Sequence, residues 1–119
     1  MTDKTPAQLA DAAGDAIRAL NHATLGSPRP DWEYPGDAYS VVGGVAYMAG
    51  MLPQAIDQIA QLLKRLEGEG HLKSDRDTLA DDLEAAHDGL TIAAGAAETL
   101  RGALDRAQNG LGSVAYKED

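Results

Sequence analysis

Apolar residues recur every three or four positions through the last third of the chain, and from residue 79 to residue 111 the steps alternate strictly between four and three. A period of 3.5 residues held over several heptads is typical of a coiled-coil helix, which needs a partner helix packed against it. The pattern therefore predicts one long helix over about 75–110. The row consists of Leu79, Leu83, Ala86, Leu90, Ala93, Ala97, Leu100, Leu104, Ala107 and Leu111.

A second row with the same repeat lies earlier in the chain and predicts the partner helix over about 38–67. Pro53 interrupts this row, and proline either kinks a helix or breaks it in two. The repeat keeps its phase across Pro53, which favours a kink near residue 53. The short turn that follows predicts an antiparallel hairpin with the 75–110 helix. The row consists of Val42, Val45, Ala49, Leu52, Ile56, Ile59, Leu63 and Leu66.

The N-terminal segment predicts a third, shorter helix over about 6–25. Thr5 suits the N-cap, Pro6 suits the first helical position, and Gln8 completes a capping box. The connector over 26–37 is rich in proline, so it is expected to be ordered but not helical.

Further capping residues are expected at the two long helices. Asp37 or Ser40 suits the start of the helix over 38–67, and Ser74 with Asp77 suits the start of the last helix. Together the elements predict an all-α fold over residues 1–119, a single domain built as an elongated three-helix bundle on a long antiparallel helical hairpin.

Composition narrows the classes of function. The chain of 119 residues has no cysteine, so disulfides and thiolate metal sites are excluded. Nineteen acidic against ten basic residues give a net charge of −9, which disfavours nucleic-acid binding. We expect no membrane span and no export signal, and therefore a cytoplasmic protein.

The residues that could carry chemistry do not form a catalytic pattern. His22, His71 and His87 fall in three different elements, so neither a metal site nor a cofactor is expected. The carboxylates over 75–88 are interpreted as a solvated acidic face, with an electropositive partner or DNA mimicry as the alternatives. Gly43 and Gly44 lack the context of a phosphate loop and suit close helix packing. The protein is therefore not expected to be an enzyme.

Two groups of side chains are candidates for binding. Aromatic residues that gather at the open end of the hairpin suit either a lid over the core or an interaction patch. The tip holds more leucine than one hairpin needs, which indicates self-association there, as a homodimer. The candidate interaction patch consists of Trp32, Tyr34, Tyr39 and Tyr47, and the candidate self-association residues are Leu63, Leu66, Leu72, Leu79 and Leu83.

Three segments resemble a group of small helical proteins of actinobacteria that have no assigned activity. These segments are IRALNHAT at 17–24, YPGDAY at 34–39 and LPQAIDQ at 52–58, with a late Ala115-Tyr116. Such proteins often occur in plasmid-like or integrated mobile elements, so the resemblance implies a cytoplasmic accessory role. It implies no activity, cofactor or catalytic residue.

The chain is also similar in size and hairpin form to WXG100-type secreted proteins, with clear departures. Trp32 precedes the hairpin, the turn over 67–73 has no tryptophan, and Tyr116 is followed by Asp119 at three residues instead of four. The main functional prediction is a non-enzymatic helical protein-protein interaction or accessory protein that self-associates. The alternative is a WXG100-like secreted partner protein.

Overall fold

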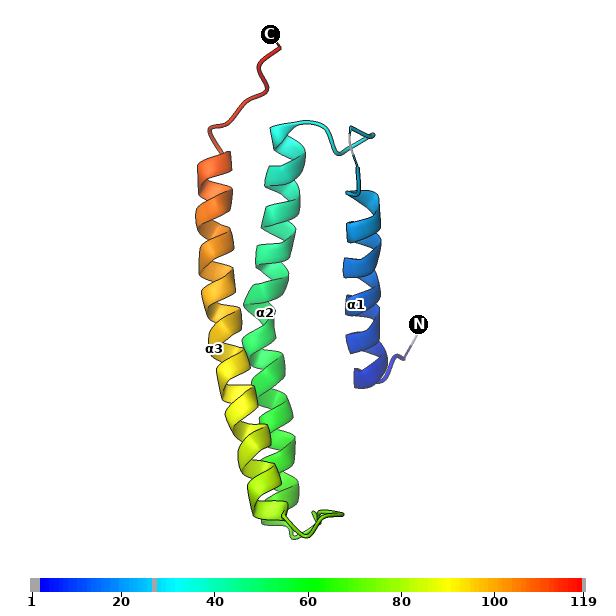
Figure 1. The fold of residues 1–119 in the computed structure, drawn as a ribbon, viewed down its shortest axis with the longest axis vertical. Helices are drawn as coiled ribbons and strands as arrows, with labels where there is room; N and C mark the ends of the chain where they lie inside the picture. The colour runs from blue at the N-terminus through cyan, green and yellow to red at the C-terminus, as the bar shows by residue number, and fades with distance from the viewer. Residues whose placement is uncertain (1–2, 27, 119) are drawn as a thin grey trace.

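Three helices make up the regular structure of residues 3–26 and 28–118, the part of the chain that the computed structural model describes. They are α1 (Pro6–Ala23), α2 (Pro35–Gly68) and α3 (Leu79–Leu111). α2 and α3 lie side by side in opposite directions, and α1 lies beside α2 on the side away from α3 (Figure 1). The molecule measures 67 × 31 × 28 Å. The fold is thus all-α, an elongated three-helix bundle built on a long antiparallel hairpin, as the apolar pattern predicts.

α1 begins with the predicted capping box. The Thr5 hydroxyl accepts a hydrogen bond from the Gln8 backbone N–H at 3.1 Å, and the Gln8 side chain accepts one from the Thr5 N–H at 2.9 Å. These two bonds satisfy donors that the first helical turn leaves free. The helix ends at Ala23, two residues before the predicted end.

The early end of α1 is stabilised by Arg29 from the connector. Its guanidinium donates hydrogen bonds to the carbonyl oxygens of His22, Ala23 and Leu25, at 2.8, 3.2 and 2.9 Å. A cation suits the C-terminal end of a helix because the free carbonyl groups carry partial negative charge there. Arg29 therefore ties the connector back onto the helix that it follows.

α2 begins at Pro35, three residues before the predicted start, because proline suits the first helical position. The Asp37 carboxylate accepts hydrogen bonds from the backbone N–H groups of Glu33 and Tyr34, both at 2.9 Å. These bonds, with that from Glu33 the larger cause, lower the pKa of Asp37 below its ordinary value. Asp37 thus caps the helix from within its first turn, whereas Ser40 lies beyond that turn.

α2 is a single helix from end to end and contains Pro53 in its interior. A break into two helices at this residue, one of the two alternatives, is therefore excluded.

The predicted start of the last helix, near residue 75, is wrong by four residues. α3 begins at Leu79, with Thr78 as its N-cap, and the Ser74–Asp77 pair does not cap it. Asp77 has a φ of +58°, in the left-handed region, so a right-handed helix cannot include it. Ser74 instead bonds to Asp82 inside α3.

The contact between α2 and α3, called the seam below, uses only every second position of the predicted row on α3. Leu83, Leu90, Ala97, Leu104 and Leu111 lie on it as predicted. At each alternate position, the residue that lies in the seam is the one that follows the predicted residue in the sequence. The predicted alternates Ala86, Ala93, Leu100 and Ala107 are exposed, and His87, Ala94, Arg101 and Gln108 occupy the seam instead.

α2 shows the same displacement. Leu52 and Ile59, both predicted in the seam, are exposed, and Pro53 and Ala60 lie closer to α3. Ala46 is buried at the seam, one residue after the predicted Val45. On α2 the hairpin therefore packs through the smaller of two possible rows and leaves the bulkier row outside, whereas the row left outside on α3 is mostly alanine.

Small residues explain this choice, because they let two backbones approach. The buried residues of the described chain are Ala46, Ala49 and Ala97, and Ala49 is 0% exposed. At two glycines of α2 a long side chain from α3 crosses the helix: Gln108 lies over Gly43 and Arg101 lies over Gly50. A Cβ at either glycine would overlap these side chains.

Candidate interaction surface

The two rows that the seam excludes, bulky on α2 and mostly alanine on α3, lie on one side of the hairpin. Gly50 lies against Arg101 and Gly43 against Gln108, one heptad apart on both helices. In an antiparallel pair of right-handed helices with this register, the residues that precede the seam by one position project to the same side on both helices. Leu52 is then level with Leu100, and Ile59 with Ala93.

We call this side of the hairpin the apolar face. The α2 residues on it are Val41, Val45, Met48, Leu52, Ala55, Ile59, Leu62 and Leu66, and the α3 residues are Ala86, Gly89, Ala93, Ala96, Leu100, Ala103 and Ala107. None of these residues is charged or polar. Ile59 is 50% exposed, Leu62 is 46% exposed and Leu100 is 43% exposed, so large aliphatic side chains here contact water.

The opposite side of the hairpin is polar and acidic. Arg101, which lies over Gly50, forms an ion pair with Asp105 on this side, at 3.2 Å. The hairpin is therefore amphipathic as a whole, because both helices turn their polar residues to one side and their apolar residues to the other. The polar side chains on this face include Gln54, Asp57, Gln61, Lys64, Glu84, Asp88, Thr91, Glu98 and Asp105.

α1 borders the apolar face without closing it. No Cα atom of α1 lies within 8 Å of a Cα atom of α2 or α3, and no residue of α1 is buried. An open apolar cavity of about 260 Å³ separates α1 from α2. Ile17 and Leu20 line it from α1, and Val45 and Met48 line it from α2. The N-terminal helix therefore covers part of the α2 edge and leaves the Ile59 and Leu100 region open.

The leucines predicted for self-association lie at the tip of the hairpin. All of them are partly buried, and none is among the strongly exposed apolar side chains. Leu63 and Leu83 lie on the seam, where they pack within one chain. Leu66 differs because it lies on the apolar face, at the end of the Val45, Leu52 and Ile59 row.

Three of the four aromatic residues of the candidate interaction patch lie at the open end of the hairpin: Trp32, Tyr34 and Tyr39. Tyr34 packs edge to face on Tyr116 from the C-terminal tail, with ring centroids 5.1 Å apart. Trp32 and Tyr34 line an open cavity of about 170 Å³. The Tyr39 ring lies beside Gly112, close to the C-terminal end of α3. These contacts fasten the tail and the connector to the open end of the hairpin.

Tyr47 does not belong to this group. Its side chain is 68% exposed and points away from α3, on the polar side of α2. Two turns of helix separate it from Tyr39.

A second cleft lies on the polar side of the hairpin, between α2 and α3, and has a volume of about 270 Å³. His87, Asp57 and Lys64 all line it. The His87 Nε2 atom is buried and has no hydrogen-bond partner, and the Asp57 carboxylate accepts a bond from the Gln61 amide at 2.6 Å. No hydrogen bond links the His87 side chain to the Asp57 carboxylate. The spacing of apolar residues on α3 predicts Ala86 in the seam, so it gives no signal that His87 lies there.

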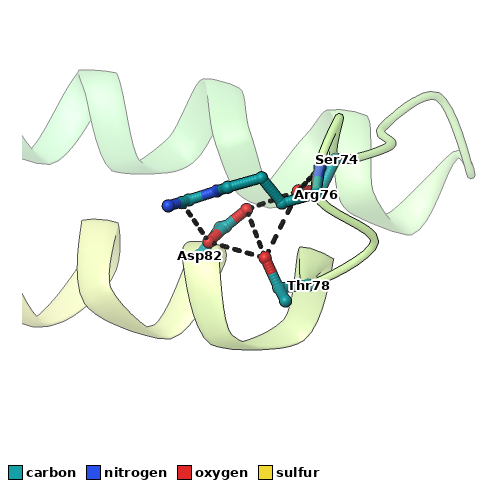
Figure 2. Close-up of polar contacts among 4 residues, drawn as sticks. All are labelled: Ser74, Arg76, Thr78 and Asp82. Atoms are coloured by element: carbon teal, nitrogen blue, oxygen red, sulfur yellow. Dashed lines mark hydrogen bonds and ion pairs between the residues drawn. The ribbon is translucent and has the colours of Figure 1, made fainter.

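A network of hydrogen bonds joins the turn between α2 and α3 to the first helical turn of α3 (Figure 2). The Asp82 carboxylate accepts hydrogen bonds from the Ser74 hydroxyl at 2.6 Å and from the Thr78 hydroxyl at 3.1 Å. Arg76 pairs with the same carboxylate at 2.9 Å. The Ser74 bond is the largest cause that holds the pKa of Asp82 below its ordinary value. Because these bonds join Ser74 and Arg76 in the turn to Asp82 in α3, the group closes the turn.

Residues 3–26 and 28–118 contain no group of three or more His, Cys, Asp or Glu side chains placed to hold a metal ion. Within the same residues, no helix combines the length and the apolar composition that crossing a bilayer requires. No protein-family model, curated protein or solved structure matches the chain.

Proposed function

We propose that this protein is a non-enzymatic helical interaction protein that acts through the apolar face of its hairpin. The observation that carries this proposal is the composition of that face, which is apolar on both helices and stays open to water. Exposed apolar surface of this extent marks interaction sites in soluble proteins. The proposal moves the binding surface from the leucine tip and the aromatic end to the middle of the hairpin.

The shape of the chain supports the same proposal. Its radius of gyration is 19.5 Å, against about 13.5 Å for a compact domain of this length. A rod of two helices has too little interior to bury large side chains, and the buried residues of the described chain are all alanine. A partner on the apolar face would supply the missing interior.

A matched pair of substitutions tests the proposal. Ile59 is 50% exposed on the apolar face, and Ile92 is 71% exposed on the outer side of α3. Proteins from the native host would be captured on the wild type, on Ile59→Asp and on Ile92→Asp. We expect Ile92→Asp to retain the partners of the wild type and Ile59→Asp to lose them. Identical capture by all three proteins would refute a role for the apolar face.

We also propose an accessory role in the cytoplasm, which the resemblance to small actinobacterial helical proteins implies. The three similar segments support this accessory role. Two of them lie on α2: YPGDAY at its start and LPQAIDQ in its middle. Cell fractionation of the native host tests the location, and recovery in the envelope or the medium would count against it.

A WXG100-like secreted protein is the second candidate. The antiparallel hairpin of two long helices favours it, whereas the turn between α2 and α3 has no tryptophan. Its test is the appearance of the protein in culture supernatant when the secretion apparatus is intact, and its loss when the apparatus is deleted.

A further inference from the structure

We propose that the partner on the apolar face is a second copy of this chain. In the proposed dimer, α2 of each copy packs on α3 of the other, and the two hairpin tips lie at the same end. This inference rests on the proposed function and names the partner that the function requires. Three observations carry it: the excess surface, the shape of the two rows and the position of the charges.

The surface area is large enough for a stable dimer. The chain exposes 9120 Å², whereas a compact monomer of 12.4 kDa would expose about 6,100 Å². The excess of about 3,000 Å² exceeds the roughly 1,000–2,500 Å² that each protomer of an obligate homodimer buries. A face-to-face dimer would therefore bury a normal interface and still leave an elongated molecule.

The two rows of the apolar face have complementary shapes. The α2 row carries bulky side chains at Val45, Leu52, Ile59 and Leu66. The α3 row is level with it and carries alanine at three of four positions, with Leu100 as the exception. Bulky side chains pack into the holes that small residues leave on a facing helix. The best match to an α2 row is therefore the α3 row of another copy.

The charges allow two identical faces to meet. A protein with a net charge of −9 repels its own copies unless the charges stay outside the contact. No apolar-face residue is charged, and Glu84, Asp88 and Asp105 lie on the opposite side of the hairpin. Two copies would meet through neutral surface, so the contact requires no oppositely charged partner.

α2 and α3 are antiparallel within one hairpin. A two-fold axis parallel to the hairpin places each α2 over the partner's α3. A two-fold axis across the hairpin would instead place α2 on α2, with bulky rows against each other. Either two-fold axis leaves every neighbouring pair of helices antiparallel, so the helix directions permit a face-to-face dimer and the shapes of the rows decide its arrangement.

Sedimentation equilibrium on the full chain tests whether a second copy binds. We expect about twice the monomer mass for the wild type and for Ile92→Asp, and the monomer mass for Ile59→Asp. By symmetry Ile59→Asp buries two unpaired carboxylates, so the dissociation constant should rise at least about 100-fold. A monomeric wild type would overturn the inference, and so would a dimer that Ile59→Asp leaves intact.

Cross-linking tests the arrangement in a way that does not depend on a destabilised variant. The chain has no cysteine, so Leu62→Cys and Gly89→Cys each introduce a single thiol. Leu62 is 46% exposed, and a Cβ at Gly89 meets no atom within 4 Å. Both positions lie on the outer edge of the apolar face and level with each other, so the proposed dimer places Leu62 of one copy opposite the partner's Gly89.

A short bismaleimide should link the two variants when they are mixed and should link neither variant to itself. Links between two Leu62→Cys chains would overturn the proposed arrangement, because they indicate α2 packed on α2. The absence of any link in a mixture would overturn it as well. If the wild type is monomeric but Ile59→Asp still loses host partners that Ile92→Asp retains, the second copy is refuted and the proposed function stands.

Discussion

Single residues decide how closely the two long helices approach. Ala49 on α2 and Ala97 on α3 are buried at the seam, and Gly50 makes room for the Arg101 side chain. In a hairpin without large buried side chains, each of these positions limits the distance between the helix axes. Added volume there cannot be absorbed by neighbouring gaps, because interiors are close-packed.

We expect Ala97→Leu to lower the free energy of unfolding by about 1–3 kcal/mol, since extra methyl groups in a packed seam force side chains and backbone apart. Ala85→Leu is the matched control: it makes the same change at an exposed position of α3 and should alter stability by no more than about 0.5 kcal/mol. Urea denaturation followed by circular dichroism measures both. Equal effects of the two substitutions would show that the seam does not pass through Ala97.

The carboxylates of Asp37 and Asp82 make stability depend on acid pH. Hydrogen bonds lower both pKa values below the ordinary 3.8, chiefly the bond from Glu33 N–H for Asp37 and the bond from Ser74 for Asp82. The unfolded chain then binds protons at a higher pH than the folded chain. The stabilisation is therefore complete above about pH 3.8 and is lost as the pH falls through the lower folded values.

We expect the melting temperature of the wild type to fall more steeply than that of Asp82→Asn between about pH 5 and about pH 2.5, because the amide cannot be protonated there. Asp88→Asn serves as the control, since Asp88 accepts no hydrogen bond from the described residues. Its melting curve should follow the wild type across this range. Parallel acid profiles for Asp82→Asn and the wild type would contradict a stabilising role for the Ser74–Asp82 contact.

At the scale of the helices, α1 differs from the other two. It has no buried residue and lies more than 8 Å, between Cα atoms, from α2 and α3. Its stability comes from its own capping box and from Arg29 at its C-terminal end. Isolated helices of this length are marginal in water, so α1 is the least stable helix of the fold.

Hydrogen exchange on the intact protein should therefore show faster amide exchange in α1 than in the middle of α2 and α3, by at least about tenfold. Arg29→Ala removes the bonds to three carbonyl groups at the end of α1 and should increase exchange in α1 further. Exchange in the middle of α3 should stay unchanged in this variant, which provides the internal control. Equal protection of α1 and α3 would show that α1 is held by contacts beyond those in a single chain.

The helical elements could be predicted from the sequence because their signals are local. The capping box at Thr5 and the heptad spacing of Leu83, Leu90 and Leu104 depend only on nearby residues, and the structure confirms both. The start of α3 could not be predicted because Asp77 takes a left-handed conformation, in the same turn where Ser74 bonds to Asp82. Both features depend on how the turn closes, which residue spacing does not encode.

The candidate site was missed for a related reason. Apolar residues on α2 occur at both Leu52 and Pro53, and at both Ile59 and Ala60, so the spacing is compatible with two seams that differ by one residue. The bulkier row was assigned to the hairpin, whereas the hairpin packs through the smaller one. A helix with two adjacent apolar rows can serve two contacts, and the pattern of one chain does not indicate which contact lies in a second molecule.

At the scale of the whole molecule, the hairpin is a rod with one apolar side. The molecule's length of 67 Å comes from α2 and α3 together with the C-terminal tail, which extends beyond the open end of the hairpin (Figure 1). A dimer with both tips at the same end would double the mass without adding length, because the copies overlap along the whole rod. A dimer with the tips at opposite ends would place each α1 beside the other copy's tip. If only the halves that α1 leaves uncovered were in contact, the particle would be longer than one copy.

Small-angle X-ray scattering on the wild type should therefore give the mass of a dimer and a maximum dimension close to the 67 Å of one copy. The cross-section should thicken, since two layers of helices stack at about 10 Å. Ile59→Asp should keep the same length, lose half the mass and return the cross-section of a single hairpin. A wild-type dimer much longer than one hairpin would contradict the arrangement with the tips together, because only partial overlap or end-to-end contact of the rods produces such a length.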